Sequence, residues 1–465
     1  MSVIIELGYL ISVLSFVLGL KLMSTPKQAE KGNMVAAVGM LVAVICTIAA
    51  GFSGSVPLTN VIIIGVAIIL GIIVGKRMAS SVEMTAMPQL VSLFNATGGG
   101  CAMLLGFIEA WDQESVSQSS GATYELLLIL GVVTGAIAFT GSILAYLKLA
   151  GKVKDNTTLA VNLVSRMFLA AMVLLPILFF SGFLPISFPT LTYVLIGVSL
   201  IYGVVFVLPI GGADMPVVIS LLNSITGIAT ALAGFLQGNK AMIAGGIFVG
   251  AAGILLTLLM CKAMNRSLLK VFAGNLSKGG GPGSDTPQEI QETSISETLT
   301  QLSFAEKIGV VPGYGMAVAQ AQQECFQLQQ ILEKRGKSID YIIHPVAGRM
   351  PGHMNVLLAE AKIDYDYLKE MDEVNPSMHE YDLLLVIGAN DVVNPAAENN
   401  TESPIYGMPI VKAHLSQKTV VMKRSMSTGY AGVQNELFEN ENCELLFGDA
   451  KQSLQEIVRQ LKLLD

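Results

Sequence analysis

The 465-residue chain has a composition that a wholly soluble protein would not have. Hydrophobic residues make up 52% of the sequence and charged residues only 14%, whereas about 25% is charged in ordinary soluble domains. The net charge of -7 argues against nucleic acid as a partner, and the five scattered cysteines indicate neither a disulfide framework nor a metal site. The composition therefore predicts a membrane protein with more than one domain.

The first 265 residues contain nine apolar stretches long enough to cross a bilayer, which takes about 20 residues. They run over Val3–Met23, Met34–Phe52, Leu58–Lys76, Met87–Ala110, Tyr124–Leu147, Leu159–Phe180, Leu191–Leu208, Met215–Leu236 and Ala241–Lys262. Lysine and arginine are concentrated in the first, third and fifth loops and after the ninth stretch. The positive-inside rule therefore predicts an outer N-terminus and a cytoplasmic location for everything after residue 262.

Two of these stretches carry polar side chains along one helical face. On the eighth stretch, helical spacing groups Ser220, Asn223, Gly227 and Thr230. On the fourth stretch, it groups Ser92, Asn95 and Gly99. Asp214 lies at the predicted cytoplasmic mouth of the eighth helix. Polar groups at membrane depth either face a cavity or bond to a neighbouring helix, and both interpretations stay open here.

Residues 266–300 are rich in glycine, serine, proline and acidic residues, which predicts a flexible tether. The tether would join a membrane domain, residues 1–265, to a soluble domain, residues 301–465. Strands and helices alternate in the soluble domain, so we expect an α/β fold with a Rossmann-like, doubly wound parallel sheet. Six strands are expected, and the sequence gives positions for all but the third: Ile308–Val311, Tyr341–His344, Leu383–Ile387, Thr419–Met422 and Leu445–Phe447. Helices are expected at Met354–Ala361 and Ala450–Leu464.

The stretch KIGVVPGYGMAVAQAQQ, residues 307–323, has the strand, turn and helix order of a dinucleotide-binding site. Gly313 and Gly315 form the turn, and a helix is predicted from Met316. Val318 replaces the third glycine of the usual motif. Taken alone, the motif fits an ordinary strand-to-helix turn equally well.

Other loops at the same expected sheet edge are also rich in glycine and polar residues, and ligands of such sheets bind at this edge. Lys423, Arg424 and Ser425, with Tyr430 nearby, suit a phosphate and an adenine ring to stack on. A 2′-phosphate would distinguish NADP from NAD. The alternative for Lys423 and Arg424 is a solvated pair of charges.

The motifs together carry a family resemblance. From Asp214-Met-Pro through GYGMAVAQAQ, RMPGHMN, GANDVVNPAA and KRSMSTGYAGVQ to LFGDAK, the chain resembles the β subunits of proton-translocating NAD(P) transhydrogenases. The resemblance implies NADP(H) on the soluble domain, and NAD(H) on a partner α subunit, one chain or two, which adds the remaining membrane helices. It further implies a dimer of αβ units in the lipid of the inner membrane. The implied reaction is NADH + NADP⁺ to NAD⁺ + NADPH with inward proton flow.

The resemblance also implies roles for residues, with the nucleotide reversed relative to usual Rossmann enzymes. Lys423, Arg424 and Ser425 would take the 2′-phosphate, and Tyr430 would close over the nucleotide. Along the pyrophosphate and nicotinamide, the implied residues are Gly313, Tyr314, Gly315, Ala317 and Val318, with Arg349 nearby. The other cofactor-binding predictions are His344, Gly352, Gly388, Asn390, Asp391 and Gly429. Asp391 matches a position linked to proton coupling, and Asp391, Asn390 and Tyr430 are the predicted catalytic positions.

For the proton path, the predicted residues are Asn95, Asp214, Asn223 and Ser224. Asn95 falls where some relatives carry a histidine. Because asparagine does not titrate, protons would pass there through water or through a group on another chain.

Direct hydride transfer needs alignment and exclusion of water rather than a side-chain acid or base. The chain has one dinucleotide motif, so the NAD(H) site must come from the partner. Two alternatives are compatible with the membrane helices and the Rossmann-like pattern: an ion transporter gated by a cytosolic NADP-sensing domain, and a quinone reductase. The second lacks any flavin or metal feature, and the length of the motifs favours the transhydrogenase over both.

Overall fold

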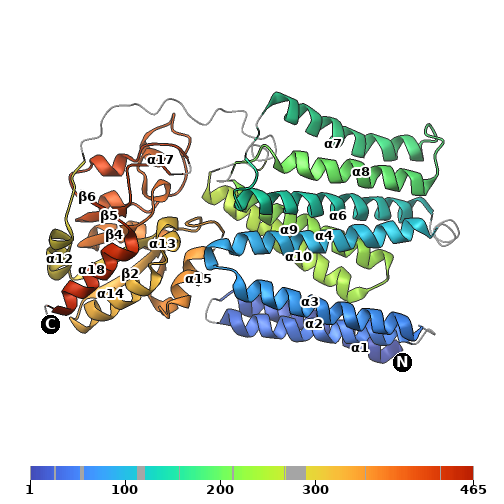
Figure 1. Cartoon of the computed structure of the whole chain (residues 1–465), viewed down its shortest axis with the longest axis horizontal. Helices are drawn as coiled ribbons and strands as arrows, with labels where there is room; N and C mark the ends of the chain where they lie inside the picture. Colours follow the sequence, from blue (N-terminus) through green and yellow to red (C-terminus); the bar gives the residue numbers. More distant parts are fainter. Residues whose placement is uncertain are drawn as a thin grey trace. The chain divides into compact units, whose positions relative to one another are not determined.

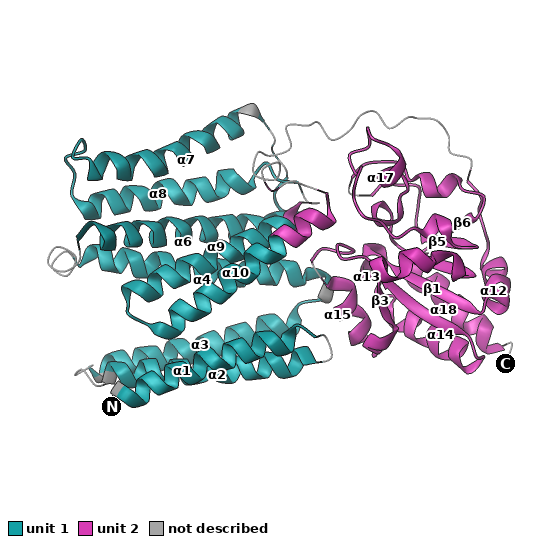
Figure 2. Ribbon diagram, turned by 180° about the vertical axis from the view of Figure 1, so that it is seen from behind, with its two compact units in different colours: residues 1–211, 217–257 teal, residues 212–216, 258–465 magenta. Residues whose placement is uncertain are grey.

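A computed structural model describes residues 2–25, 28–52, 57–112, 121–154, 156, 158–211, 214–265, 268, 290–350, 352–429 and 431–463. The chain divides into two compact units (Figure 2). One unit comprises Met1–Gly211 and Val217–Thr257, and the other comprises Gly212–Pro216 and Leu258–Asp465.

Within the described residues, nine helices are long and apolar enough to cross a membrane (Figure 1). They are α1 (Ser2–Met23), α2 (Ala29–Phe52), α3 (Leu58–Ser81), α4 (Met87–Trp111), α6 (Gly121–Leu149), α7 (Leu159–Phe180), α8 (Phe188–Val207), α9 (Met215–Leu236) and α10 (Lys240–Ala263). The nine predicted spans are confirmed, although α2 begins before Met34 and α3 continues past Lys76. The helices extend into flanking polar residues because backbone hydrogen bonding does not stop where apolar composition does.

Small residues let several of these helices pack closely. A methyl group on Gly99 of α4 would lie 2.8 Å from the Ala138 side chain of α6, and one on Gly135 of α6 would lie 2.8 Å from the backbone of α4. Gly227 of α9 likewise faces the backbone of Gly250 on α10. Such glycine contacts are a usual way for membrane helices to approach each other.

The second unit contains a six-stranded sheet in which every pairing is parallel. Its strands are β1 (Lys307–Pro312), β2 (Ser338–Ile343), β3 (Leu368–Glu370), β4 (Leu383–Ile387), β5 (Thr419–Lys423) and β6 (Cys443–Phe447). The order is β3-β2-β1-β4-β5-β6, which is doubly wound as predicted. In the centre of the sheet, Val310 lies between Tyr341 and Leu385.

Among the described residues from 290 onward, the α-helices are α12 (Ile295–Phe304), α13 (Tyr314–Ala319), α14 (Gln322–Lys334), α15 (His353–Glu360), α16 (Met371–Val374), α17 (Ala396–Asn399) and α18 (Ala450–Leu463). The helix predicted from Met316 begins at Tyr314 and ends at Ala319, because Gln320 adopts a left-handed conformation with φ 52°. The predicted tether includes the start of α12, and residues 266, 267 and 269–289 lie outside the described residues.

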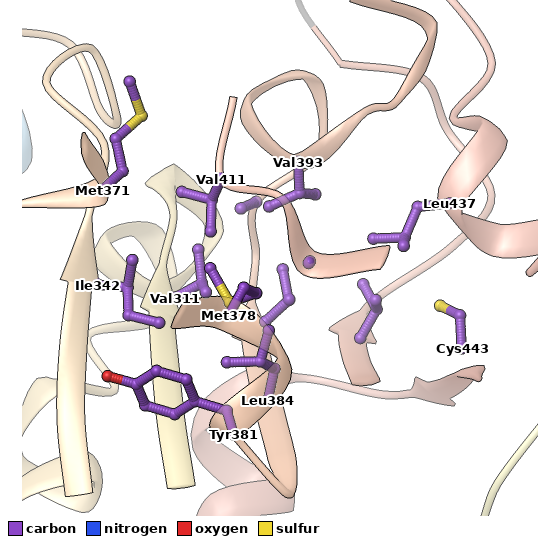
Figure 3. Packing of buried hydrophobic residues seen from close by; sticks show 14 of the residues in the cluster. Val311, Ile342, Met371, Met378, Tyr381, Leu384, Val393, Val411, Leu437 and Cys443 are labelled. Carbon is purple, nitrogen blue, oxygen red and sulfur yellow. The ribbon is translucent and has the colours of Figure 1, made fainter. Parts of the chain in front are cut away.

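The central strands are buried on both faces, as parallel strands usually are. Every residue of β4 is buried. Leu384 and Val386 join Val311, Val421 and Leu445 in a cluster on one face, together with Met378 and Tyr381 from the chain that leads into β4 (Figure 3). This packing fixes the strand ends that carry the candidate site.

Candidate functional site

A cavity of about 610 Å³ lies at the carboxyl ends of β1, β4 and β5. The sheet order explains its position. From β1, the chain builds β2 and β3 on one side and β4 to β6 on the other, so the loops after β1 and β4 diverge and leave a crevice between them. The predicted site residues that line it are Gly313, Tyr314, Gly315, Gly388, Asn390, Asp391, Lys423, Arg424, Ser425 and Gly429.

Three glycines form the floor of this cavity. The Gly315 N–H donates to the Gly388 carbonyl at 2.9 Å, and Gly313 donates to Ile387 at the same distance. A methyl group on Gly313, Gly315 or Gly388 would overlap the backbone of the opposite loop. Gly388 also has φ 65°, which disfavours any residue with a side chain. The two loops can therefore touch only through glycine, and this leaves room above them for a ligand.

A cationic group forms another part of the lining. Lys423 ends β5, and its ammonium lies 4.2 Å from the Phe438 ring centre. Burial lowers the pKa of Lys423 to about 8, and the negative charge of Asp391 partly opposes this shift. Arg424 and Ser425 follow on an exposed turn in which Ser425 bonds the Ser427 hydroxyl at 3.1 Å. Two cations and a hydroxyl thus line the cavity on consecutive residues, an arrangement that suits a phosphate.

The loop after β4 is tied to the loop after β5 by side chains that the sequence reasoning did not select. The Asn435 amide donates to both the backbone and the side-chain oxygen of Asn390, each at 3.0 Å. Asn394 donates to Gln434 at 3.0 Å and accepts from the Glu436 N–H at 3.1 Å. The available signal was that Asn394 lies within the GANDVVNP motif and that Asn435 directly follows the GYAGVQ motif.

Asp391 is part of the same connection. Its carboxylate accepts the Ala431 N–H at 3.0 Å. Gly429 lies so close that a methyl group there would overlap this carboxylate. The position of Asp391 and the course of the loop after β5 are therefore interdependent.

The other predicted residues that the structure describes do not line the cavity. Ala317 is fully buried and Val318 is 43% exposed, and neither lines the cavity. Arg349 lies over Tyr314, with 4.6 Å between the guanidinium carbon and the ring centre. Gly352 precedes α15 in a left-handed conformation. Tyr430 lies outside the described residues.

His344 is buried at the end of β2 and bonds the Pro409 carbonyl through Nε2 at 2.8 Å. Its Nδ1 accepts the Val346 N–H at 3.2 Å. Burial lowers the pKa of His344 to about 4, so the ring is neutral at pH 7. Its neutral ring anchors the start of the loop that carries Arg349.

The predicted proton-path residues make separate contacts in the membrane helices. The Asn95 amide donates to the Ser142 hydroxyl of α6 at 2.8 Å, and Ser224 donates to the Gly250 carbonyl of α10 at 2.9 Å. Asn223 lines a second, largely apolar cavity of about 1010 Å³, which Asn95 does not line. Asp214 is buried at the residue before α9. Ser142 is a partner that the sequence reasoning did not name.

The family model described as NAD(P) transhydrogenase beta subunit matches residues 5–460. The NAD(P) transhydrogenase subunit beta of Rhodospirillum rubrum is 40% identical over 462 residues, which is 98% of this chain and 98% of that protein. A second R. rubrum sequence of the same name gives the same identity and coverage.

Proposed function

The chain belongs to the family of NAD(P) transhydrogenase β subunits, and from this premise we propose that its own cavity at the ends of β1, β4 and β5 binds NADP(H). The chain is a membrane subunit of the proton-translocating transhydrogenase. Its membership in the β-subunit family implies that an α subunit is its partner. The observation that carries the proposal is that the glycine floor and the Lys423–Arg424–Ser425 group line one cavity.

The residues of the cavity fit this ligand. Its volume of about 610 Å³ lies within the usual range for small-molecule sites, roughly 300–1,000 Å³. Lys423, Arg424 and Ser425 would hold the 2′-phosphate, and Gly313 and Gly315 would let the pyrophosphate approach the backbone. Tyr314, with Arg349 over its ring, would form the wall near the nicotinamide. NADH lacks the 2′-phosphate, so the cationic group would select against it.

The residues of this chain bind and orient the nucleotide and exclude water from it. When bound, the nicotinamide supplies or accepts the hydride, and the NAD(H) side of the reaction belongs to the α subunit in this proposal. A dimer of αβ units in the inner membrane, with the sheet domain in the cytoplasm, completes the proposed assembly. The uneven distribution of lysine and arginine between the loops supports that orientation.

Proton coupling is proposed to use Asn95, Asn223, Ser224 and Asp214 in the membrane helices and Asp391 in the nucleotide loops. A proton crossing the membrane supplies about 2.3 kcal/mol per 100 mV. That energy serves the reaction only if protonation changes the affinity for NADP(H). Asp391 suits this role because its carboxylate contacts the loop that follows Lys423.

The lowered pKa of Lys423 predicts how NADPH binding depends on pH. Affinity should fall as the pH rises through about 8, because the neutral amine no longer pairs with the phosphate. Below about pH 6 it should also fall, because the phosphate gains a proton. Dissociation constants measured from pH 5.5 to 9.5 check this, with Lys423→Arg as the control: arginine stays charged and should remove the alkaline decline. An alkaline decline that survives in Lys423→Arg would show that Lys423 is not its cause.

Gly429→Ala is expected to weaken NADPH binding about tenfold. A loss of this size corresponds to roughly one hydrogen bond to a charged group. The added methyl would force the Asp391 carboxylate to turn away and give up the Ala431 N–H. Calorimetric titration of the full-length variant measures the effect. Unchanged affinity would mean that the loop position near Asp391 does not matter for binding.

Reduction of NAD⁺ by NADPH in vesicles that contain this chain and its α subunit tests the proposed function. We expect transfer that requires both subunits, together with proton movement across the vesicle membrane. Ligand-dependent ion flux without any hydride transfer would instead support the gated transporter.

A further inference from the structure

The described part of the loop after β2, residues 344–350, supplies part of the cavity wall. Val346, Ala347 and Gly348 line the cavity, and Arg349 follows them. The Arg349 guanidinium lies over Tyr314, which also lines the cavity. The position of this loop therefore decides the shape of the wall on the Tyr314 side.

One buried imidazole lies next to Gly348, Arg349 and Tyr314. His353 is the first residue of α15 and is only 2% exposed. Its Nδ1 accepts the Arg349 backbone N–H at 3.1 Å. Its ring centre lies 6.3 Å from that of Tyr314, at an angle of 53°. A methyl group on Gly348, which has φ 106°, would overlap the imidazole.

The hydrogen bond requires the neutral imidazole. Nδ1 can accept the Arg349 N–H only when it carries no proton, so the ring hydrogen belongs on Nε2. Burial, and secondarily the positive charge of Arg349, lower the pKa of His353, which keeps the ring neutral at pH 7. His344 holds the start of the same loop in the same way, through its own Nδ1.

We infer that His353 is a positioning residue for the NADP(H) cavity: its Nδ1 holds the Arg349 backbone, and its ring packs near Tyr314. This inference rests on the proposed function. Neither His353 nor Arg349 lines the cavity, so His353 acts on the nucleotide through Tyr314, which lines the cavity and which the Arg349 guanidinium covers. A histidine that merely fills the core would matter for its volume, whereas this role depends on the acceptor atom.

The test separates the acceptor from the ring. His353→Phe keeps an aromatic ring and removes the acceptor, and His353→Asn keeps an acceptor and removes the ring. In the full-length chain, His353→Phe is expected to weaken NADPH binding about tenfold, and His353→Asn to restore most of that loss. His379→Leu, at an exposed histidine outside the cavity lining, is the control and should bind NADPH like the wild type.

A double-mutant cycle shows whether His353 acts on NADPH binding through the side chain of Arg349. If it does, adding His353→Phe to Arg349→Ala should cause little further loss. Additive losses would overturn the inference, as would unchanged NADPH affinity in His353→Phe. If His353→Phe does not fold, His353→Leu replaces it as the variant without an acceptor.

Limited trypsin cleavage after Arg349 tests the loop without any nucleotide. Cleavage at the Arg349–Met350 bond should be faster in His353→Phe than in the wild type and in His353→Asn. Equal rates would contradict the positioning role even if NADPH binds as proposed. A wild-type chain that binds no NADPH would instead remove the proposed function, and the assignment of this wall to NADP(H) with it.

Discussion

Replacing Lys423 and Arg424 together by alanine is expected to lower the affinity of the full-length chain for NADPH by at least about a hundredfold, while its weak affinity for NADH changes little. Hydrogen bonds to charged groups contribute about 1.5–3 kcal/mol each, and 1.4 kcal/mol corresponds to a factor of ten. Both residues line the cavity, and only NADPH has the phosphate that they would bind. Isothermal titration with each nucleotide measures the change.

A matched control for this pair is Arg459→Ala/Lys462→Ala. Both residues are exposed on α18 and lie outside the cavity lining. Their removal takes the same charge from the protein, so a general electrostatic effect would appear in both variants. If the two double variants lost NADPH affinity equally, Lys423 and Arg424 would not be the phosphate site.

Asp391→Asn is expected to slow NADPH release and proton-coupled turnover by about tenfold or more. Asparagine has the same shape and keeps an oxygen for the Ala431 N–H, so the loop should remain in place. What disappears is a negative charge that acts on Lys423 and would repel the nucleotide phosphates. NADPH should therefore bind more tightly and leave more slowly. Stopped-flow fluorescence measures release, and turnover is measured in vesicles with the α subunit.

Asp366→Asn makes the same chemical change at an exposed position outside the cavity lining, and it should behave like the wild type. Comparison of the two variants isolates the contribution of the Asp391 charge. Unchanged release and turnover in Asp391→Asn would remove Asp391 from the coupling mechanism.

The sequence predicted most of the fold because both halves carry strong local patterns. Nine apolar stretches of about 20 residues predict nine membrane-spanning helices. The continuous apolar run of Leu383–Ile387 is typical of a central parallel strand. The third strand could not be placed, because Leu368–Glu370 is three residues long and two of them are charged. The end of α13 at Ala319 could not be predicted either, since no glycine or proline marks it.

The site was predictable where it depends on strand ends and not where it depends on distant pairs. Parallel strands bring their carboxyl ends to one edge, so the loops holding Gly313, Gly388 and Lys423 had to meet. The bond between Asn435 and Asn390 joins positions 45 residues apart, and no local pattern reveals such a pair. The turn of α13 directs Ala317 into the core and leaves Val318 exposed, a distinction that the motif does not contain.

The central claim is that this chain itself carries the NADP(H) site. Titration of the purified full-length chain, without its α subunit, with NADPH and separately with NADH tests it most directly. We predict one NADPH bound per chain, with far weaker binding of NADH. Equal affinity for the two nucleotides, or no binding of either, would contradict the claim.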